Sequence, residues 1–189
     1  MPDSIYCYPD SDVLINKLGI TNSDRLHDAE RKLTMLRLME LLQRPIKGNF
    51  DFDHLKAIHR YIFQDVYEWA GQVRTVDIAK GNMFCNAMFI DEQAQIIFEK
   101  LKEENYLQDL SRELFAKRAA YFFSEINALH PFREGNGRSQ REFIRSLALL
   151  NGYKIQFAKC SEEEMLTASK SSFICDYTAM EKLFLKCLG

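Results

Sequence analysis

The segment from His130 to Arg141, HPFREGNGRSQR, carries the side chains whose types and spacing could do chemistry. Gly135 and Gly137 stand two residues apart, and glycine lets backbone N–H groups converge on an anion without a Cβ in the way. Arg138 and Arg141 fall in the first turn of the helix expected to follow, where a spacing of three places them on one face. The positive end of that helix points to the same place. The pattern predicts an anion cradle with two cationic side chains.

Glu134 and His130 would give this cradle a reaction. An acid inside an anion site would repel phosphate unless a divalent cation lay between them, and Mg²⁺ is typically held by one or two carboxylates plus substrate phosphates. His130 could take a proton from an incoming hydroxyl. Phosphoryl or nucleotidyl transfer would use such a set, because it needs positioning and charge stabilisation. The alternatives are a Glu134 paired with Arg133 or Arg138, and a His130 that caps a helix or is satisfied in the core.

Helical periodicity predicts the elements that must position this segment. A buried helix should end at His130, because Pro131 disfavours helix for the residue before it, and another should run from about 137 to 150. Two further helices are expected in the first half of the chain, one from Asn22 or Ser23 to before Pro45 and one from Asp51 or Asp53 through Trp69 towards Gly71. Others are expected to start at a cap at Asp91, at Ser111 and at a Ser161–Glu164 capping box, and a last one to cover 176–187. Segment 73–90 breaks the pattern, and Gly81-Asn82 between the short runs RTVDI and MFCNAMFI predicts a β-hairpin.

Length, composition and charge limit the function classes. A chain of 189 residues suits one domain. With 25 Lys+Arg against 27 Asp+Glu the net charge is −2, which gives no global attraction to nucleic acid or an anionic membrane. The chain has no run of about 18 uncharged apolar residues and no secretory signal at its start. Five scattered cysteines without a CxxC pair are typical of reduced thiols. We therefore expect a cytoplasmic protein, or one in a host cytosol if it is delivered.

The twelve residues from His130 to Arg141 match every fixed position of the Fic motif, HxFx[D/E]GNGRxxR. The resemblance to the Fic family extends to LKAIHRYIFQDVYEWAGQVRTVDIAKG and to YPDSDVLINKLGI, which is similar to the start of compact bacterial toxins of the FicT type. It implies a single all-α Fic domain over 1–189, with the Fic loop at 130–141 and a small β-hairpin flap at about 73–90. It also implies protein adenylylation, in which AMP passes from Mg-ATP to a hydroxyl side chain of a target protein.

The resemblance assigns roles to single residues. His130 is the general base, Phe132 anchors the loop in the core, Glu134 binds Mg²⁺, Gly135, Asn136 and Gly137 form the anion hole for ATP, and Arg138 and Arg141 hold its β- and γ-phosphates. In the flap, Lys80, Gly81, Asn82 and Met83 would dock an extended target segment by β-augmentation. Gly137 stands where the kinase branch of the family, the Doc toxins, has lysine, which favours adenylylation over phosphorylation.

Partners follow from the same resemblance. Many Fic proteins carry an inhibitory helix with the motif [S/T]xxxE[G/N], but no Ser or Thr here is followed by Glu four residues later. A separate small antitoxin would then supply the glutamate and capture Arg141, and the ATPase subunits of gyrase and topoisomerase IV are implied as targets. The alternatives left open are a Fic-type kinase or phosphocholine transferase, a non-catalytic nucleotide-binding interaction module, and a helical DNA-binding protein that uses Arg138, Arg141 and Arg145.

Overall fold

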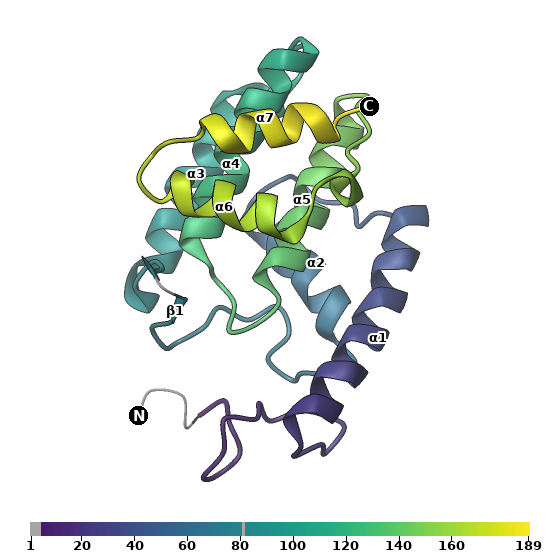
Figure 1. Cartoon of the computed structure of the whole chain (residues 1–189), viewed down its shortest axis with the longest axis vertical. Coiled ribbons are helices and arrows are strands. Elements are labelled where there is room, and N and C mark those ends of the chain that lie inside the picture. Colours follow the sequence, from purple (N-terminus) through teal and green to yellow (C-terminus); the bar gives the residue numbers. More distant parts are fainter. Residues whose placement is uncertain (1–4, 81) are drawn as a thin grey trace.

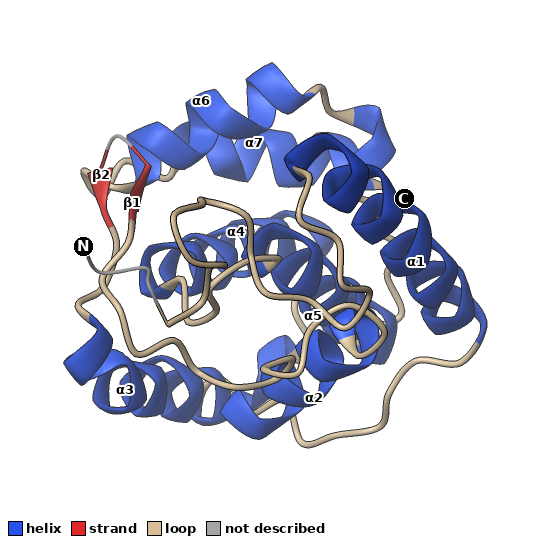
Figure 2. Ribbon diagram, turned by 90° about the horizontal axis from the view of Figure 1, so that it is seen from below, coloured by secondary structure: helices blue, strands red, loops and turns tan. Residues whose placement is uncertain are grey.

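A computed structural model of the chain describes residues 5–80 and 82–189. Its helices are α1 (Ser23–Gln43), α2 (Phe52–Phe63), α3 (Ile90–Glu103), α4 (Arg112–Leu129), α5 (Asn136–Leu150), α6 (Glu162–Ser172) and α7 (Thr178–Cys187), and its strands are β1 (Ala79–Lys80) and β2 (Asn82–Met83). Figure 1 shows α1 along one side of the molecule. In Figure 2, α4 and α5 lie in the middle and the other helices surround them. The predicted all-α fold with a small hairpin is confirmed.

Side-chain caps place the helix starts where the sequence predicts them. The side chains of Asn22, Asp51 and Ser111 each accept a hydrogen bond from the backbone N–H three residues further on. Ser161 and Glu164 form the expected capping box in both directions. These bonds satisfy donors that the first turn of a helix leaves without an intrahelical partner. The starts of α1, α2, α4 and α6 are therefore encoded locally.

The helical period misled the prediction for α2. This helix ends at Phe63, and the chain then turns through 64–71 instead of continuing to Gly71. Val66 and Tyr67 in that turn are fully buried, so their apolar spacing reflects packing of a turn against the same core. Asp91 is a smaller correction: it lies in the first turn of α3, after a 3-10 turn, and does not cap the helix.

The hairpin is present but shorter than expected. Its antiparallel ladder pairs only Ala79 with Met83 and Lys80 with Asn82. The sequence predicts strands at 74–78 and 83–90. The first run is irregular; in the second, only Met83 lies in a strand, and 84–86 lead through a 3-10 turn (Ala87–Phe89) into α3. Gly81, a predicted docking residue, lies outside the described residues. Contacts other than a β-ladder must therefore hold the flap.

The core gathers around α4, the helix expected to be central. Its buried side chains include Phe115, Phe122, Phe123 and Ile126, and each such residue contributes about 1.5–3 kcal/mol when it leaves water. The end of α4 and the start of α5 bound the segment that carries the predicted chemistry, so the core holds both ends of that loop. In the described part of the chain, no helix has the length and apolar character to span a membrane.

Candidate active site

The loop between α4 and α5 begins and ends in the left-handed region of the backbone. His130 caps α4 with φ at 46°, a conformation that costs a non-glycine residue about 1–2 kcal/mol. Gly135 precedes α5 with φ at 81°. A Cβ on Gly135 would lie 2.1 Å from the Phe63 ring of α2. The first glycine of the motif is thus required by the close approach of the loop to α2.

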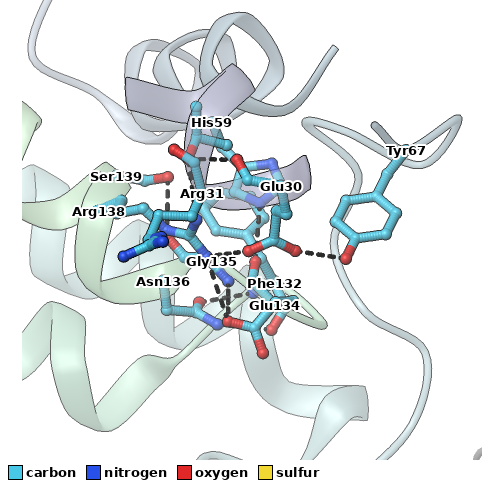
Figure 3. A network of polar contacts seen from close by, with 11 residues as sticks. Glu30, Arg31, His59, Tyr67, Phe132, Glu134, Gly135, Asn136, Arg138 and Ser139 are labelled. Carbon is cyan, nitrogen blue, oxygen red and sulfur yellow. Dashed lines mark hydrogen bonds and ion pairs between the residues drawn. The ribbon is translucent and has the colours of Figure 1, made fainter. Parts of the chain in front are cut away.

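Buried side chains hold the middle of the loop, as Figure 3 shows. The Phe132 ring is buried and stacks on His59 with 3.8 Å between ring centroids, which is the anchoring expected of it. The Asn136 side chain accepts from the Phe132 N–H at 2.9 Å and donates to its carbonyl at 2.7 Å. The predicted anion-hole asparagine therefore uses its side chain to shape the loop, and only its backbone N–H is left to face an anion.

His59 is a positioning residue that the sequence analysis did not identify, because it lies outside the motif and no local pattern connects it with the loop. It is fully buried. Its Nδ1 accepts from the Gly71 N–H at 2.8 Å, so Nε2 carries the hydrogen and donates to the Glu134 carbonyl at 2.9 Å. Burial is the main cause that lowers the pKa of His59 to about 3, and the Arg138 charge adds to it. His59 therefore stays neutral and keeps this tautomer.

Arg138, predicted to hold phosphate, points to α1 (Figure 3). Its Nη2 lies 2.6 Å from Glu30 Oε1 and its Nη1 lies 3.0 Å from Thr34 Oγ1. Its guanidinium also lies over the Phe63 ring at 4.6 Å. The Tyr67 hydroxyl donates to the other oxygen of Glu30. In this conformation Arg138 ties the loop to α1, and its contact with phosphate stays a prediction.

One cavity brings the other predicted groups together. It has a volume of about 600 Å³ and includes His130, Gly137 and Arg141 in its lining, while Glu134 and Arg138 lie outside that lining. The rest of the wall is mixed. Its large apolar side chains come from the flap, α4, α6 and the segments that flank α6: Phe84, Phe123, Phe157, Met165, Leu166 and Phe173. Its polar and charged members include one carboxylate, Glu162, and a second cation, Lys170. An apolar wall next to a helix N-terminus and a cation fits a nucleotide, with its base on the wall and its phosphates at the helix.

A second cavity of about 620 Å³ lies between the start of α2 and α3. Four carboxylates contribute to its lining, those of Asp51, Asp53, Asp91 and Glu99, with Lys102 as a cation. This charge would repel a triphosphate, so the cavity at His130 is the candidate site.

Arg141 places a positive charge next to the N-terminus of α5 in the candidate site, and Lys170 also lines the cavity. Arg141 is half-buried and lies one turn after Gly137 on the same face of α5. Burial and the nearby Arg138 lower its pKa, and Glu162 opposes them, but a guanidinium stays charged in proteins. Within residues 5–80 and 82–189, no acceptor or carboxylate bonds to its side chain. A half-buried cation that forms no ion pair in this part of the chain makes the cavity attractive to an anion, and Glu162 offsets only part of that charge.

The ring of His130 has a defined orientation. Nδ1 lies 3.3 Å from the Asn127 carbonyl, which can only accept, so Nδ1 carries the hydrogen and the lone pair is on Nε2. The Phe84 ring of the flap stacks on the imidazole with 3.7 Å between centroids. Such a histidine can act as a general base. The stacking also joins the flap directly to the loop, which no sequence signal predicted.

Glu134 and the flap residues complete the predicted set. The Glu134 side chain is 34% exposed, and its Oε1 accepts from the Gly135 N–H at 2.8 Å and lies 3.6 Å from Arg138 Nη2. No group of three or more His, Cys, Asp or Glu in the described ranges could hold a metal alone.

Lys80 and Asn82 lie on β1 and β2, and Met83 is 71% exposed, as a docking residue needs to be.

Replacing Glu30 by alanine is expected to lower the free energy of unfolding by about 3–5 kcal/mol, because it leaves the Arg138 guanidinium without its carboxylate in a largely buried place. Denaturant unfolding measures this loss. The matched control is Glu40→Ala. Glu40 lies on the same helix as Glu30, but its carboxylate is exposed and bonds Arg37 and Tyr61. Exposed pairs contribute little, so equal losses in the two variants would contradict the role given to Glu30.

Comparison with known proteins agrees with this geometry. The chain is 43% identical over 179 residues to protein adenylyltransferase VbhT of Bartonella schoenbuchensis, and the match covers 94% of this chain and 37% of that protein. It is 37% identical over 182 residues to "Probable protein adenylyltransferase Fic" of Escherichia coli, with 96% of this chain and 90% of that protein covered. The chain thus spans well under half of VbhT but nearly all of the E. coli protein.

Solved structures share the fold. The N-terminal Fic domain of a VirB-translocated Bep effector from Bartonella quintana, with bound ADP, has a TM-score of 0.93 at 32% identity, and the match covers 98% of this chain and 94% of that one. BepC from Bartonella tribocorum, with bound AMPPNP, has a TM-score of 0.91 at 26% identity and covers 100% and 98%. A family model described as "Fic/DOC family" matches residues 49–148. The resemblance seen in the sequence is therefore confirmed, and the chain belongs to the Fic/DOC family.

Proposed function

We propose that this chain is a protein adenylyltransferase, which transfers AMP from ATP to a hydroxyl side chain of a target protein. The observation that carries the proposal is the convergence of three groups on one cavity: the His130 imidazole, the N-terminus of α5 at Gly137, and the Arg141 cation. The names of VbhT and of the E. coli relative support the reaction type. The ADP and AMPPNP bound by the two Bartonella domains support a nucleotide in this fold.

The residues divide the chemistry between them. The N–H groups of Asn136 and Gly137 have no intrahelical acceptor at the start of α5, so they can bind the triphosphate. Nε2 of His130 takes the proton of the target hydroxyl, and the oxygen of that hydroxyl attacks the α-phosphorus. The bond from the α-phosphorus to the bridging oxygen breaks, and pyrophosphate leaves. Arg141 stabilises the charge that develops on the departing pyrophosphate.

Mg²⁺ is part of the proposal because Glu134 suits it. A single, partly exposed carboxylate next to a phosphate site is the kind of ligand set that Mg²⁺ takes, with substrate phosphates and water as the other ligands. Glu30 is closer to Arg138 than Glu134 is, at 2.6 Å against 3.6 Å. The charge of Arg138 is therefore largely balanced by Glu30, and Glu134 keeps negative charge for a cation. Bound Mg²⁺ would neutralise phosphate charge.

Labelled ATP tests the reaction type. With ATP labelled at the α-phosphate, the target protein is expected to keep the label, and with ATP labelled at the γ-phosphate it is expected to stay unlabelled. The reverse result would indicate a kinase. Absence of both labels from every protein of a bacterial lysate, under conditions where the chain binds ATP, would favour the non-catalytic interaction module.

Replacing Arg141 by alanine is expected to weaken ATP binding by about 10- to 100-fold, since hydrogen bonds to charged groups contribute about 1.5–3 kcal/mol. Isothermal titration with a non-hydrolysable ATP analogue measures the change. The control is Arg60→Ala, which removes an exposed arginine of α2. An Arg141→Ala variant that binds the analogue as tightly as the Arg60→Ala variant would exclude Arg141 from the phosphate site.

A separate antitoxin is the proposed source of inhibition. Arg141 has no carboxylate bonded to it in the described structure, and the chain has no [S/T]xxxE[G/N] helix of its own. A helical peptide with that motif is expected to inhibit AMP transfer, and its Glu→Gly variant is expected not to. The ATPase subunits of gyrase and topoisomerase IV are the proposed targets. Mass spectrometry of lysate proteins after incubation with Mg-ATP would identify the modified protein and residue.

A further inference from the structure

A charged side chain is buried where the flap meets the catalytic loop. Arg74 lies just before the flap strands and is 1% exposed. The carboxylate paired with it, that of Asp77, is as far as 4.0 Å from its Nη1. A guanidinium in such a place is costly unless hydrogen bonds compensate for lost water. Burial lowers the pKa of Arg74, in line with this cost. Its hydrogen bonds therefore decide what it does.

The bonds of Arg74 join three segments of backbone. Nε donates to the carbonyl of His130 at 2.8 Å, Nη1 donates to the carbonyl of Val76 at 2.6 Å, and Nη2 donates to the carbonyl of Cys85. The backbone N–H of Arg74 donates to the carbonyl of Pro131 at 2.9 Å. Val76 precedes β1 and Cys85 follows β2. One planar side chain thus holds both limbs of the flap and the residue that carries the imidazole.

The flap needs such a contact because its own ladder is minimal. Two paired positions do not hold a hairpin in water, where even longer two-stranded hairpins are marginal. Two neighbouring contacts also attach the flap to the end of α4 and the catalytic loop. The Cys85 N–H donates to the Ala128 carbonyl at 3.0 Å, and Phe84 stacks on the His130 ring. The bond from Arg74 to the His130 carbonyl also supports the left-handed backbone of that residue.

We propose that Arg74 is a positioning residue that locks the flap and His130 into one unit, so that a target segment docked on the flap meets the imidazole at a set distance. The inference rests on the proposed adenylyl transfer. Its physical basis is that reacting atoms must be held near their attack geometry, and a displacement of about 1 Å can cost roughly 10²-fold in rate. ATP binding relies mainly on the N-terminus of α5 and Arg141. Among the flap residues that the structure describes, Phe84 alone contributes to the cavity wall, so ATP affinity depends on the flap much less than target attack does.

Arg74→Met keeps the length of the side chain and removes its donors. It is expected to lower kcat/KM for the protein target by roughly 10²-fold and to change the affinity for an ATP analogue far less, because Phe84 is the one described flap residue in the cavity lining. Arg74→Lys keeps the charge but lacks the planar fork that reaches several carbonyls, so it is expected to recover only part of the loss. The matched control is Arg112→Met, because the Arg112 guanidinium also bonds two backbone carbonyls, Leu185 at 2.9 Å and Leu188 at 2.8 Å, away from the cavity.

Amide hydrogen exchange of the full chain without nucleotide or target gives a second, independent readout. In Arg74→Met and Arg74→Lys, exchange is expected to rise across 76–85, and in Arg112→Met it is expected to stay as in the wild type there. If wild-type exchange at 76–85 persists without the guanidinium, the proposal is wrong. It is also wrong if Arg112→Met lowers target kcat/KM as much as Arg74→Met does.

The exchange experiment separates this inference from the proposed function. A wild-type chain that transfers no AMP would overturn the adenylyltransferase proposal, yet exchange at 76–85 would still show whether Arg74 holds the flap. Should Arg74→Met fail to fold, the comparison passes to Arg74→Lys. If Arg74→Lys retains both wild-type exchange and wild-type target KM and kcat, the lock does not depend on the guanidinium and the proposal is overturned.

Discussion

Replacing His130 by alanine is expected to slow AMP transfer by about 10²- to 10⁴-fold, the usual contribution of a general base, while ATP binding persists. The loss follows from the tautomer set by the Asn127 carbonyl, which puts the lone pair on Nε2. With alanine, the target hydroxyl would have to lose its proton to water. Transfer of α-labelled AMP measures the rate, and titration with a non-hydrolysable analogue measures binding.

The control for His130→Ala is His27→Ala, which removes an exposed histidine of α1. It should transfer AMP at the wild-type rate. The informative comparison is between the rate of AMP transfer and the affinity for the ATP analogue. A residue that only shapes the cavity would reduce both together. Wild-type transfer rates in His130→Ala would remove the imidazole from the mechanism and leave the cavity as a nucleotide-binding site only.

Replacing Gly135 by alanine is expected to lower the free energy of unfolding by about 2–5 kcal/mol, from left-handed strain of about 1–2 kcal/mol plus overpacking of about 1–3 kcal/mol. The new Cβ would overlap the Phe63 ring at 2.1 Å, and the loop would have to move away from α2. Because that shift displaces the start of α5, AMP transfer should fall as well. Chemical denaturation and the labelling assay measure the two effects.

Gly152 offers a matched control. It also has a positive φ, 76°, but a Cβ there meets nothing within 4 Å. Gly152→Ala should therefore show only the cost of the left-handed backbone, about 1–2 kcal/mol, and keep its activity. Equal losses at the two positions would mean that the loop tolerates the added methyl group and that the contact with Phe63 does not require glycine.

The sequence predicted those features that depend on neighbouring residues. The end of α4 at His130 follows from Pro131, and the caps at Asn22, Asp51 and Ser111 need only a side chain and an N–H three residues away. Local patterns failed for α2, where buried residues of a turn continue the helical spacing beyond Phe63. They also overestimated the flap strands, because β-prone composition does not say which backbone groups find a partner strand.

Roles within the motif were harder to assign from its residues. The motif predicts that Arg138 and Asn136 bind ATP, and this stays a prediction; the motif does not show that their side chains also bond Glu30 and the Phe132 backbone. A motif gives residue types and spacing along the chain, but the direction of each side chain depends on which groups the neighbouring helices bring close. Glu30 is 108 positions from Arg138 in the sequence, and no spacing rule connects the two.

By itself, the sequence determined the helical class, the place of the reactive loop, and its membership of a nucleotide-using family, since these depend on short-range patterns. Only the tertiary structure decided that His59 bonds the backbone of the loop, that Arg138 pairs with Glu30 of α1, and that Arg74 joins the flap to His130. Those contacts form between segments far apart in the chain. They exist because the packing of α1, α2 and the flap around α4 and α5 buries polar groups that must then find partners.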